Sequence, residues 1–215
     1  MPRFADLLGL FGSAVVIVAG AAAAGRRLGL PRSKLASLTG VVAVAALVPI
    51  GGLPLSALLR GIAGDWSLTT LILLLGDLHR AFRPGEETFS PRGVRALQVL
   101  LTAGGLFLYP LALGLGAWDP YRLGYGHPWL VAVLLLVALG SLLLDLRLVT
   151  FAVALAVLSW AAAAGESRNL WDYLLDPPVF LWSLASLLAR ASAALARGRR
   201  RGGDEPVRIP AGSSR

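Results

Sequence analysis

Long apolar runs alternate with short polar islands along most of the chain. The clearest runs are Leu7–Ala24, Leu35–Ile50, Ala96–Gly116, Leu130–Leu144 and Leu148–Ala164. A helix needs roughly 17–25 mainly apolar residues to cross a bilayer, and several of these runs reach or approach that length. The pattern therefore predicts an all-α, polytopic helical integral membrane protein.

About seven transmembrane segments fit the pattern. In chain order they are Phe4–Ala24, Leu35–Leu59, Ser67–Phe82, Val94–Gly116, Pro128–Leu144, Leu148–Ala164 and Pro177–Ala196. A single helix over 128–164 would be about 55 Å long, too long to cross a hydrocarbon core of roughly 30 Å once. We therefore expect a hairpin that turns at Asp145–Arg147. Residues 1–196 form one transmembrane domain, and the basic tail 197–215 has no apolar periodicity and is expected to be disordered.

The distribution of arginine and lysine predicts the orientation. With the C-terminus in the cytoplasm, the inside segments hold sixteen of the twenty basic residues, and the outside segments keep only Arg3, Arg60, Arg122 and Arg168. The acidic residues divide six and six, so the bias comes from the cations, as the positive-inside rule requires. We expect N-out, C-in. The first run is short enough to be a signal peptide, but the arginines directly behind it favour a retained span.

Composition agrees with a membrane protein. Hydrophobic residues make up 56% of the chain and charged residues 15%, whereas soluble domains carry nearer a quarter charged residues. The mean hydropathy is +0.71 and the pI is about 11.1. Because the basic residues flank apolar spans, they indicate contact with anionic lipid headgroups rather than nucleic acid. Arginine-rich, lysine-poor usage is typical of a high-G+C bacterium, so the expected location is the bacterial inner membrane.

Two prolines and two glycines interrupt the second predicted span. These residues, Pro49, Gly51, Gly52 and Pro54, lie near its outer end. Broken helices at membrane depth are tolerated where protein or water covers the freed backbone, and transporters use them as binding sites. An ordinary proline kink, followed by a short interfacial or re-entrant helix over Leu53–Leu59, is the simpler interpretation.

Candidate chemistry is confined to the predicted outer face. Its polar residues are Arg60, Asp65, His127, Glu166, Arg168 and Asp172. Local capping explains some of the neighbouring polar groups. Asn169 and Asp176 are typical N-caps, and Asp65 is expected to cap the helix that follows it in the sequence. We expect no metal site, because zinc takes three or four protein ligands and His127 is the only histidine on this face. The chain has no cysteine, and no cofactor motif occurs.

Three classes of function fit these observations. The first is a non-catalytic membrane component, such as a subunit, assembly factor or scaffold with membrane-protein partners. The second is a transporter or flippase for a lipid-linked or amphipathic substrate. The third is an outer-leaflet enzyme, in which Arg60 and Arg168 bind an anion and the acids or His127 transfer protons. No strong catalytic signature occurs in the sequence, so we rank the component first and the enzyme last.

Overall fold

The computed structural model describes residues 4–49 and 51–203, and for residues 198–203 only the backbone. It is 77% helical and has no strand in these ranges, which confirms the all-α prediction. The elements, in which η1 is a 3₁₀ helix, are α1 (Phe4–Arg27), α2 (Arg32–Leu47), α3 (Leu55–Ala63), α4 (Leu68–Phe82), α5 (Pro91–Ala112), η1 (Pro120–Gly124), α6 (Pro128–Leu143), α7 (Arg147–Ala161), α8 (Leu170–Leu174) and α9 (Pro177–Gly203).

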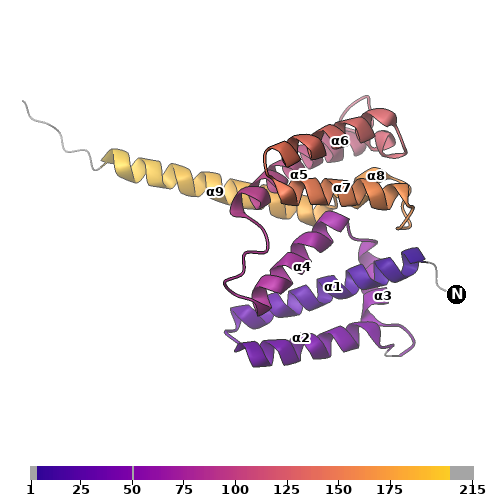
Figure 1. Cartoon of the computed structure of the whole chain (residues 1–215), viewed down its shortest axis with the longest axis vertical. Helices are drawn as coiled ribbons and strands as arrows, with labels where there is room; N and C mark the ends of the chain where they lie inside the picture. The colour runs from indigo at the N-terminus through magenta and orange to yellow at the C-terminus, as the bar shows by residue number, and fades with distance from the viewer. Residues whose placement is uncertain (1–3, 50, 204–215) are drawn as a thin grey trace, which may run out of the picture.

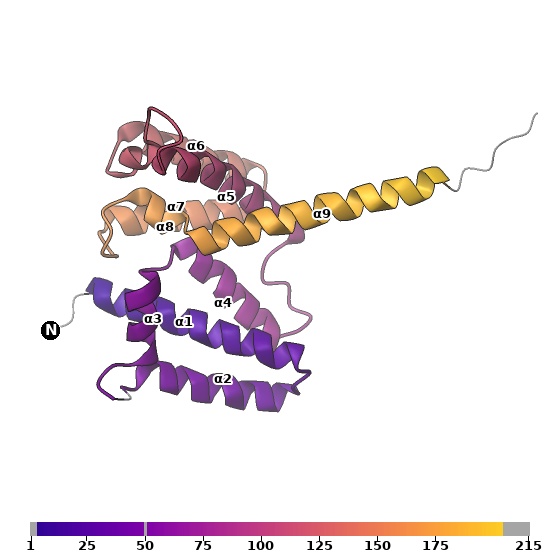
Figure 2. The ribbon, with the colours of Figure 1, turned by 180° about the vertical axis from the view of Figure 1, so that it is seen from behind.

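The helices form two groups. In the first, α1 packs on α2 and α4, and the short helix α3 runs across one end of α1 (Figure 1). In the second, α5 packs on α7 and α9, and α6 lies on α7. Contacts of α4 with α7 and α8 join the two groups (Figure 2). We call the end with α3, η1 and α8 the α8 end, and the end with the α4–α5 connection the loop end.

Several helices begin with a polar cap followed by proline. The pairs are Ser90–Pro91, Asp119–Pro120, His127–Pro128 and Asp176–Pro177, and in each the first side chain accepts a hydrogen bond from a backbone N–H of the next turn. Proline at the first helical position has no N–H to leave unsatisfied, and its fixed φ suits a helix start. These local signals set where the helices begin.

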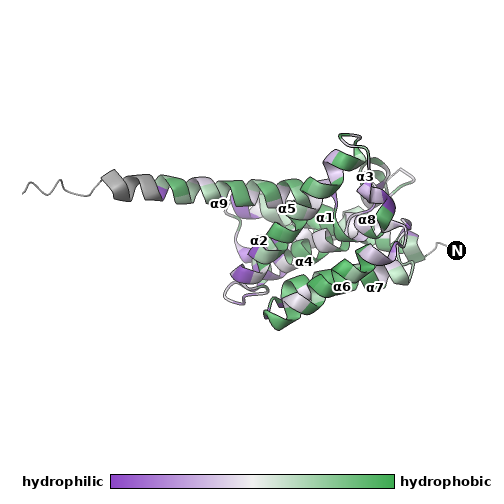
Figure 3. Cartoon of the chain, turned by 90° about the horizontal axis from the view of Figure 1, so that it is seen from above, coloured by the Kyte–Doolittle hydropathy of each residue, from purple (hydrophilic) through white to green (hydrophobic). Residues whose placement is uncertain are grey.

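The buried apolar core lies mainly between α5, α6, α7, α8 and the start of α9. Hydrophobic residues also cover the outside of the bundle, and the hydrophilic residues gather at helix ends and in loops (Figure 3). Within the described ranges, three helical segments are long and apolar enough to cross a membrane, namely Phe4–Arg27, Pro91–Ala112 and Pro177–Arg197. Helices α6 and α7 are apolar but shorter.

The second predicted span is two helices. α2 ends at Leu47 and α3 starts at Leu55, so the interrupted segment does not continue as one helix. Gly51 and Gly52 have φ of 71° and 107°, a region that glycine enters without the steric cost other residues meet. The chain therefore changes direction here, and α3 is a separate element.

Two further boundaries bear on the predictions. The hairpin predicted at Asp145–Arg147 is confirmed, since α6 ends at Leu143, α7 begins at Arg147 and the two helices pack together. Helix α9 reaches Gly203, so the first residues assigned to the tail are helical. The rest of the tail, 204–215, lies outside the described residues.

Candidate functional site

An ion-paired cluster around Arg60 occupies the α8 end. Arg60 lies in the last turn of α3, and its guanidinium Nε donates to Asp65 Oδ1 at 2.7 Å. A second nitrogen, Nη2, lies 2.9 Å from Oε1 of Glu166 in the α7–α8 connection. Oδ1 of Asp6, in the first turn of α1, lies 3.5 Å from Nη1 of Arg60. We call these four residues the Arg60 cluster.

The Arg60 cluster holds one cation among three carboxylates. Only 16% of the Arg60 side chain is exposed, whereas the exposed fraction is 30% for Asp65 and 59% for Glu166. Hydrogen bonding to Asp65 raises the pKa of Arg60 above its ordinary value, although burial acts in the opposite direction. Gly9 of α1 lies directly against the guanidinium, where a Cβ would overlap Arg60 and Asp65. The cluster thus ties α1, α3 and the α7–α8 connection together.

Asp172 belongs to a second, adjacent network. Its carboxylate accepts hydrogen bonds from the Tyr121 hydroxyl at 2.9 Å and from the Ser167 hydroxyl at 2.5 Å. Burial, and then the bond to Asp172, raises the pKa of Tyr121. Asn169 caps α8 by accepting from the Trp171 backbone N–H, as predicted, and its amide donates to the Tyr121 carbonyl at 2.9 Å. These bonds hold η1 against α8.

His127 and Arg168 do not join either network. His127 is the N-cap of α6, where its Nδ1 accepts from the Trp129 backbone N–H at 3.4 Å. The exposed Arg168 side chain makes no hydrogen bond or ion pair with any residue that the structure describes, and only its carbonyl accepts from Trp160 Nε1. Of the six sequence candidates, the structure brings Arg60, Asp65 and Glu166 together, with Asp172 beside them.

The capping role predicted for Asp65 is wrong. Ser67 is the N-cap of α4, because its hydroxyl accepts from the Thr70 backbone N–H. Asp65 lies two residues before this cap and pairs with Arg60 instead. The predicted cap Asp176 does accept from the Val179 N–H at 2.8 Å, and it also accepts from the Ser67 N–H at 3.0 Å and the Thr70 hydroxyl at 2.6 Å. This buried carboxylate therefore links the starts of α4 and α9.

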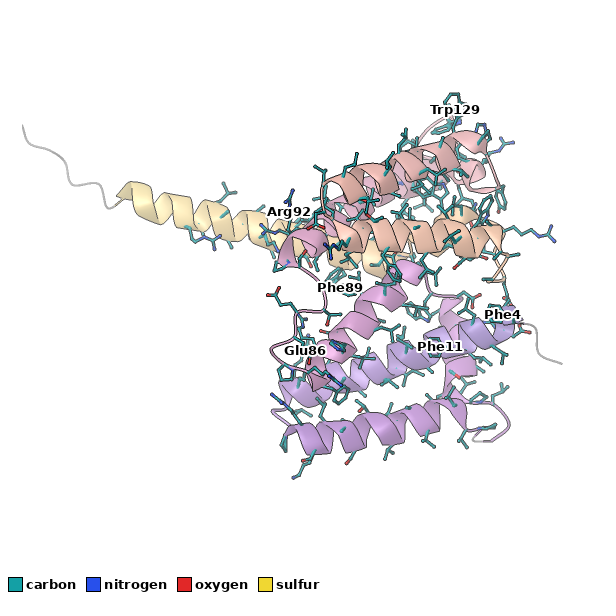
Figure 4. All side chains as sticks on the ribbon, viewed as in Figure 1. Phe4, Phe11, Glu86, Phe89, Arg92 and Trp129 are labelled. Carbon is teal, nitrogen blue, oxygen red and sulfur yellow. The ribbon has the colours of Figure 1, made fainter. Side chains whose placement is uncertain are left out.

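Three participants were missed from sequence. Asp6 had a detectable signal, since it lies near the start of the first span, on the same predicted side as Arg60. Tyr121 had none beyond its place in an outer loop, because its bond to Asp172 results from packing of η1 on α8. Ser167 lies five residues before Asp172, so its bond is local, and no motif marked it. Figure 4 shows the ends of the bundle, with Phe4 and Trp129 at the α8 end and Glu86 and Arg92 at the loop end.

The space beside the Arg60 cluster is small. A cleft of about 40 Å³ is bounded there by polar residues that include Asp65, Glu166 and Asp172. That is room for only a few waters, since one water needs roughly 10–15 Å³ of such space. Among the described residues, no group of three or more His, Cys, Asp or Glu is arranged to hold a metal ion. The geometry supports charge pairing between helices.

Comparison with known proteins found no family model, no curated protein and no solved structure that this chain matches.

Proposed function

We propose that the chain is a multi-pass protein of the bacterial inner membrane, with seven spans and the N-out, C-in orientation. The side-by-side arrangement of α1, α2, α4, α5, α6, α7 and α9 supports this count. The inside segments hold sixteen of the twenty basic residues, and this bias supports the orientation. The α8 end then faces the periplasm and the loop end faces the cytoplasm, where arginines contact anionic headgroups.

Within the membrane, we propose that the protein is a non-catalytic component such as a subunit, assembly factor or scaffold. The observation that carries this proposal is the closure of the Arg60 cluster. Arg60 is occupied by three carboxylates, and the adjacent cleft has a volume of about 40 Å³, against roughly 300–1,000 Å³ for small-molecule pockets. An outer-leaflet enzyme would need an accessible anion-binding arginine beside the acidic residues. Arg60 is already paired, and the exposed Arg168 side chain joins neither polar network.

Native isolation tests the component proposal. The full chain is tagged at low copy, extracted in a mild detergent, and resolved by size with identification of every co-migrating protein. The proposal expects at least one other membrane protein in a fixed ratio to the chain. An untagged strain and a tagged, unrelated inner-membrane protein serve as controls for carry-over. Recovery of the chain alone, in a folded state, would contradict the proposal.

Handling of an amphipathic substrate is the second candidate. A groove of about 900 Å³ between α4 and α9 favours it, because this volume lies at the upper end of the range for small-molecule sites. The predicted break at Pro49–Pro54 does not line this groove. A substrate-handling function would therefore use α4 and α9 in place of the break between α2 and α3.

A further inference from the structure

Helices α4 and α9 start together at the α8 end and then separate. The Asp176 carboxylate holds their first turns together through Ser67 and Thr70. From there α9 follows α5, with Phe180 packed directly against Gly105, while α4 stays with α1 and α7 (Figure 2). The two helices therefore bound a wedge that is closed at the α8 end and widens toward the loop end.

The groove of about 900 Å³ lies in this wedge. The α4–α5 loop crosses its wide end, with Phe89 packed against Gly76 of α4 (Figure 4). Its apolar walls come from α1, α4, α5 and α9, and they include Val16, Leu73, Leu74, Val94, Val179 and Trp182.

The length of the groove suits an acyl chain. On α4 it is lined from Thr70 to Arg80, a separation of ten residues that corresponds to a rise of about 15 Å at 1.5 Å per residue. The hydrocarbon core is roughly 30 Å thick, so the groove is about half as long as the core is thick. The Asp176 link closes the groove at the α8 end. An acyl chain that enters from the loop end fits a groove of this length.

Charged residues of both signs line the wide end. Arg80 is 69% exposed and pairs with Asp77 at 2.8 Å. Glu86 and Glu87 come from the loop, and Glu86 contacts Arg83 at 3.4 Å. Glu87 makes no ion pair with any residue in the described ranges. An arginine complements a phosphate, and the two glutamates complement an amine. Together they match a headgroup that carries both charges.

We propose that this groove binds an aminophospholipid of the inner leaflet, such as phosphatidylethanolamine. One acyl chain lies between α4 and α9, the phosphate lies at Arg80, and the amine lies at Glu86 and Glu87. The proposal rests on the membrane orientation given above and is independent of whether the protein has partner subunits. Loss of lipid binding and loss of co-isolated proteins are separate outcomes.

Native mass spectrometry of the full chain tests the site. The protein is extracted from bilayer nanodiscs that contain equal amounts of phosphatidylethanolamine and phosphatidylglycerol, and the retained lipid is identified. The Leu74→Trp variant fills the groove, and Leu75→Trp is the matched control because Leu75 is exposed on the same helix and does not line the groove. Wild type and Leu75→Trp are expected to retain one phosphatidylethanolamine, and Leu74→Trp to lose it.

The double variant Glu86→Gln, Glu87→Gln tests headgroup choice without changing the apolar walls. Its preference for phosphatidylethanolamine over phosphatidylglycerol should fall about tenfold, the effect of one lost charge-assisted hydrogen bond. Both glutamates lie on an exposed loop, so this variant keeps the test valid even if Leu74→Trp does not fold. Three results would each overturn the proposal. They are equal retention of phosphatidylethanolamine by Leu74→Trp and Leu75→Trp, an unchanged lipid preference in the double variant, and a protein bound in place of lipid at Leu74.

Discussion

Replacement of Gly9 by alanine tests whether the Arg60 cluster holds the α8 end together. An added Cβ at position 9 would overlap the Arg60 guanidinium and the Asp65 carboxylate. To make room, the side chains must move and at least one ion pair must lengthen. Gly20→Ala is the matched control, since it lies in the same helix and a Cβ there meets no atom within 4 Å.

The expected effects of the two substitutions have opposite signs. Alanine in place of an interior helical glycine stabilises by about 0.5–1 kcal/mol, and Gly20→Ala should show this gain. Overpacking costs about 1–3 kcal/mol. Exposed ion pairs contribute only about 0–1 kcal/mol, but Arg60 is mostly buried and its pairs should contribute more. We expect Gly9→Ala to be less stable than Gly20→Ala by about 2 kcal/mol.

Thermal unfolding of both purified variants in the same detergent measures this difference. For chains of 150–250 residues, 1 kcal/mol shifts the Tm by roughly 2–4 °C, so a separation of about 4–8 °C is expected. If Gly9→Ala unfolds at the same temperature as Gly20→Ala, the cluster does not lock α1 to α3, and our reasoning about it is refuted.

Two other substitutions follow from the same packing. Asp176→Ala removes the acceptor of three hydrogen bonds and leaves buried donors at the starts of α4 and α9. It should destabilise the protein by about 2–4 kcal/mol. The control Glu87→Ala, on the exposed loop, should change stability by less than about 0.5 kcal/mol. Chemical denaturation of the two variants compares them, and equal stabilities would disprove the α4–α9 link. Gly124→Ala places a Cβ against the buried Asn169 amide and should cost about 1–3 kcal/mol, whereas Gly140→Ala, with open space around it, should be neutral or slightly stabilising. If the Gly124→Ala and Gly140→Ala variants unfold at the same temperature, η1 and α8 are not tightly packed.

Local signals accounted for much of the fold. The cap-and-proline pair at Asp176–Pro177 and the cap Asn169 predicted helix starts, because a side chain satisfies N–H groups only a few residues away. The length limit of a membrane helix predicted the turn at Asp145–Arg147, although the segment 142–150 around this turn contains no glycine or proline. Both kinds of inference depend on nearby residues or on chain length alone.

The candidate site depended on distant residues, so sequence predicted it only in part. Ser67 caps α4, whereas Asp65 pairs with Arg60. Arg60 also pairs with Asp6 and Glu166, which lie far from it in the sequence. His127 has the chemistry of a site residue but is used as a cap. The groove left no sequence signal, because it results from the packing of α9 on α5 in preference to α4.

The proposed orientation in the membrane is the central claim, since the assignment of the Arg60 cluster to the periplasm and of the groove to the inner leaflet both depend on it. The chain has no cysteine, so single cysteines can be introduced at Glu87 and Arg168, two exposed positions at opposite ends of the bundle. Intact cells are treated with a membrane-impermeant maleimide, and permeabilised cells provide the full-labelling control. The account predicts labelling of Arg168→Cys in intact cells and of Glu87→Cys only after permeabilisation. Labelling of Glu87→Cys from the periplasm would contradict it.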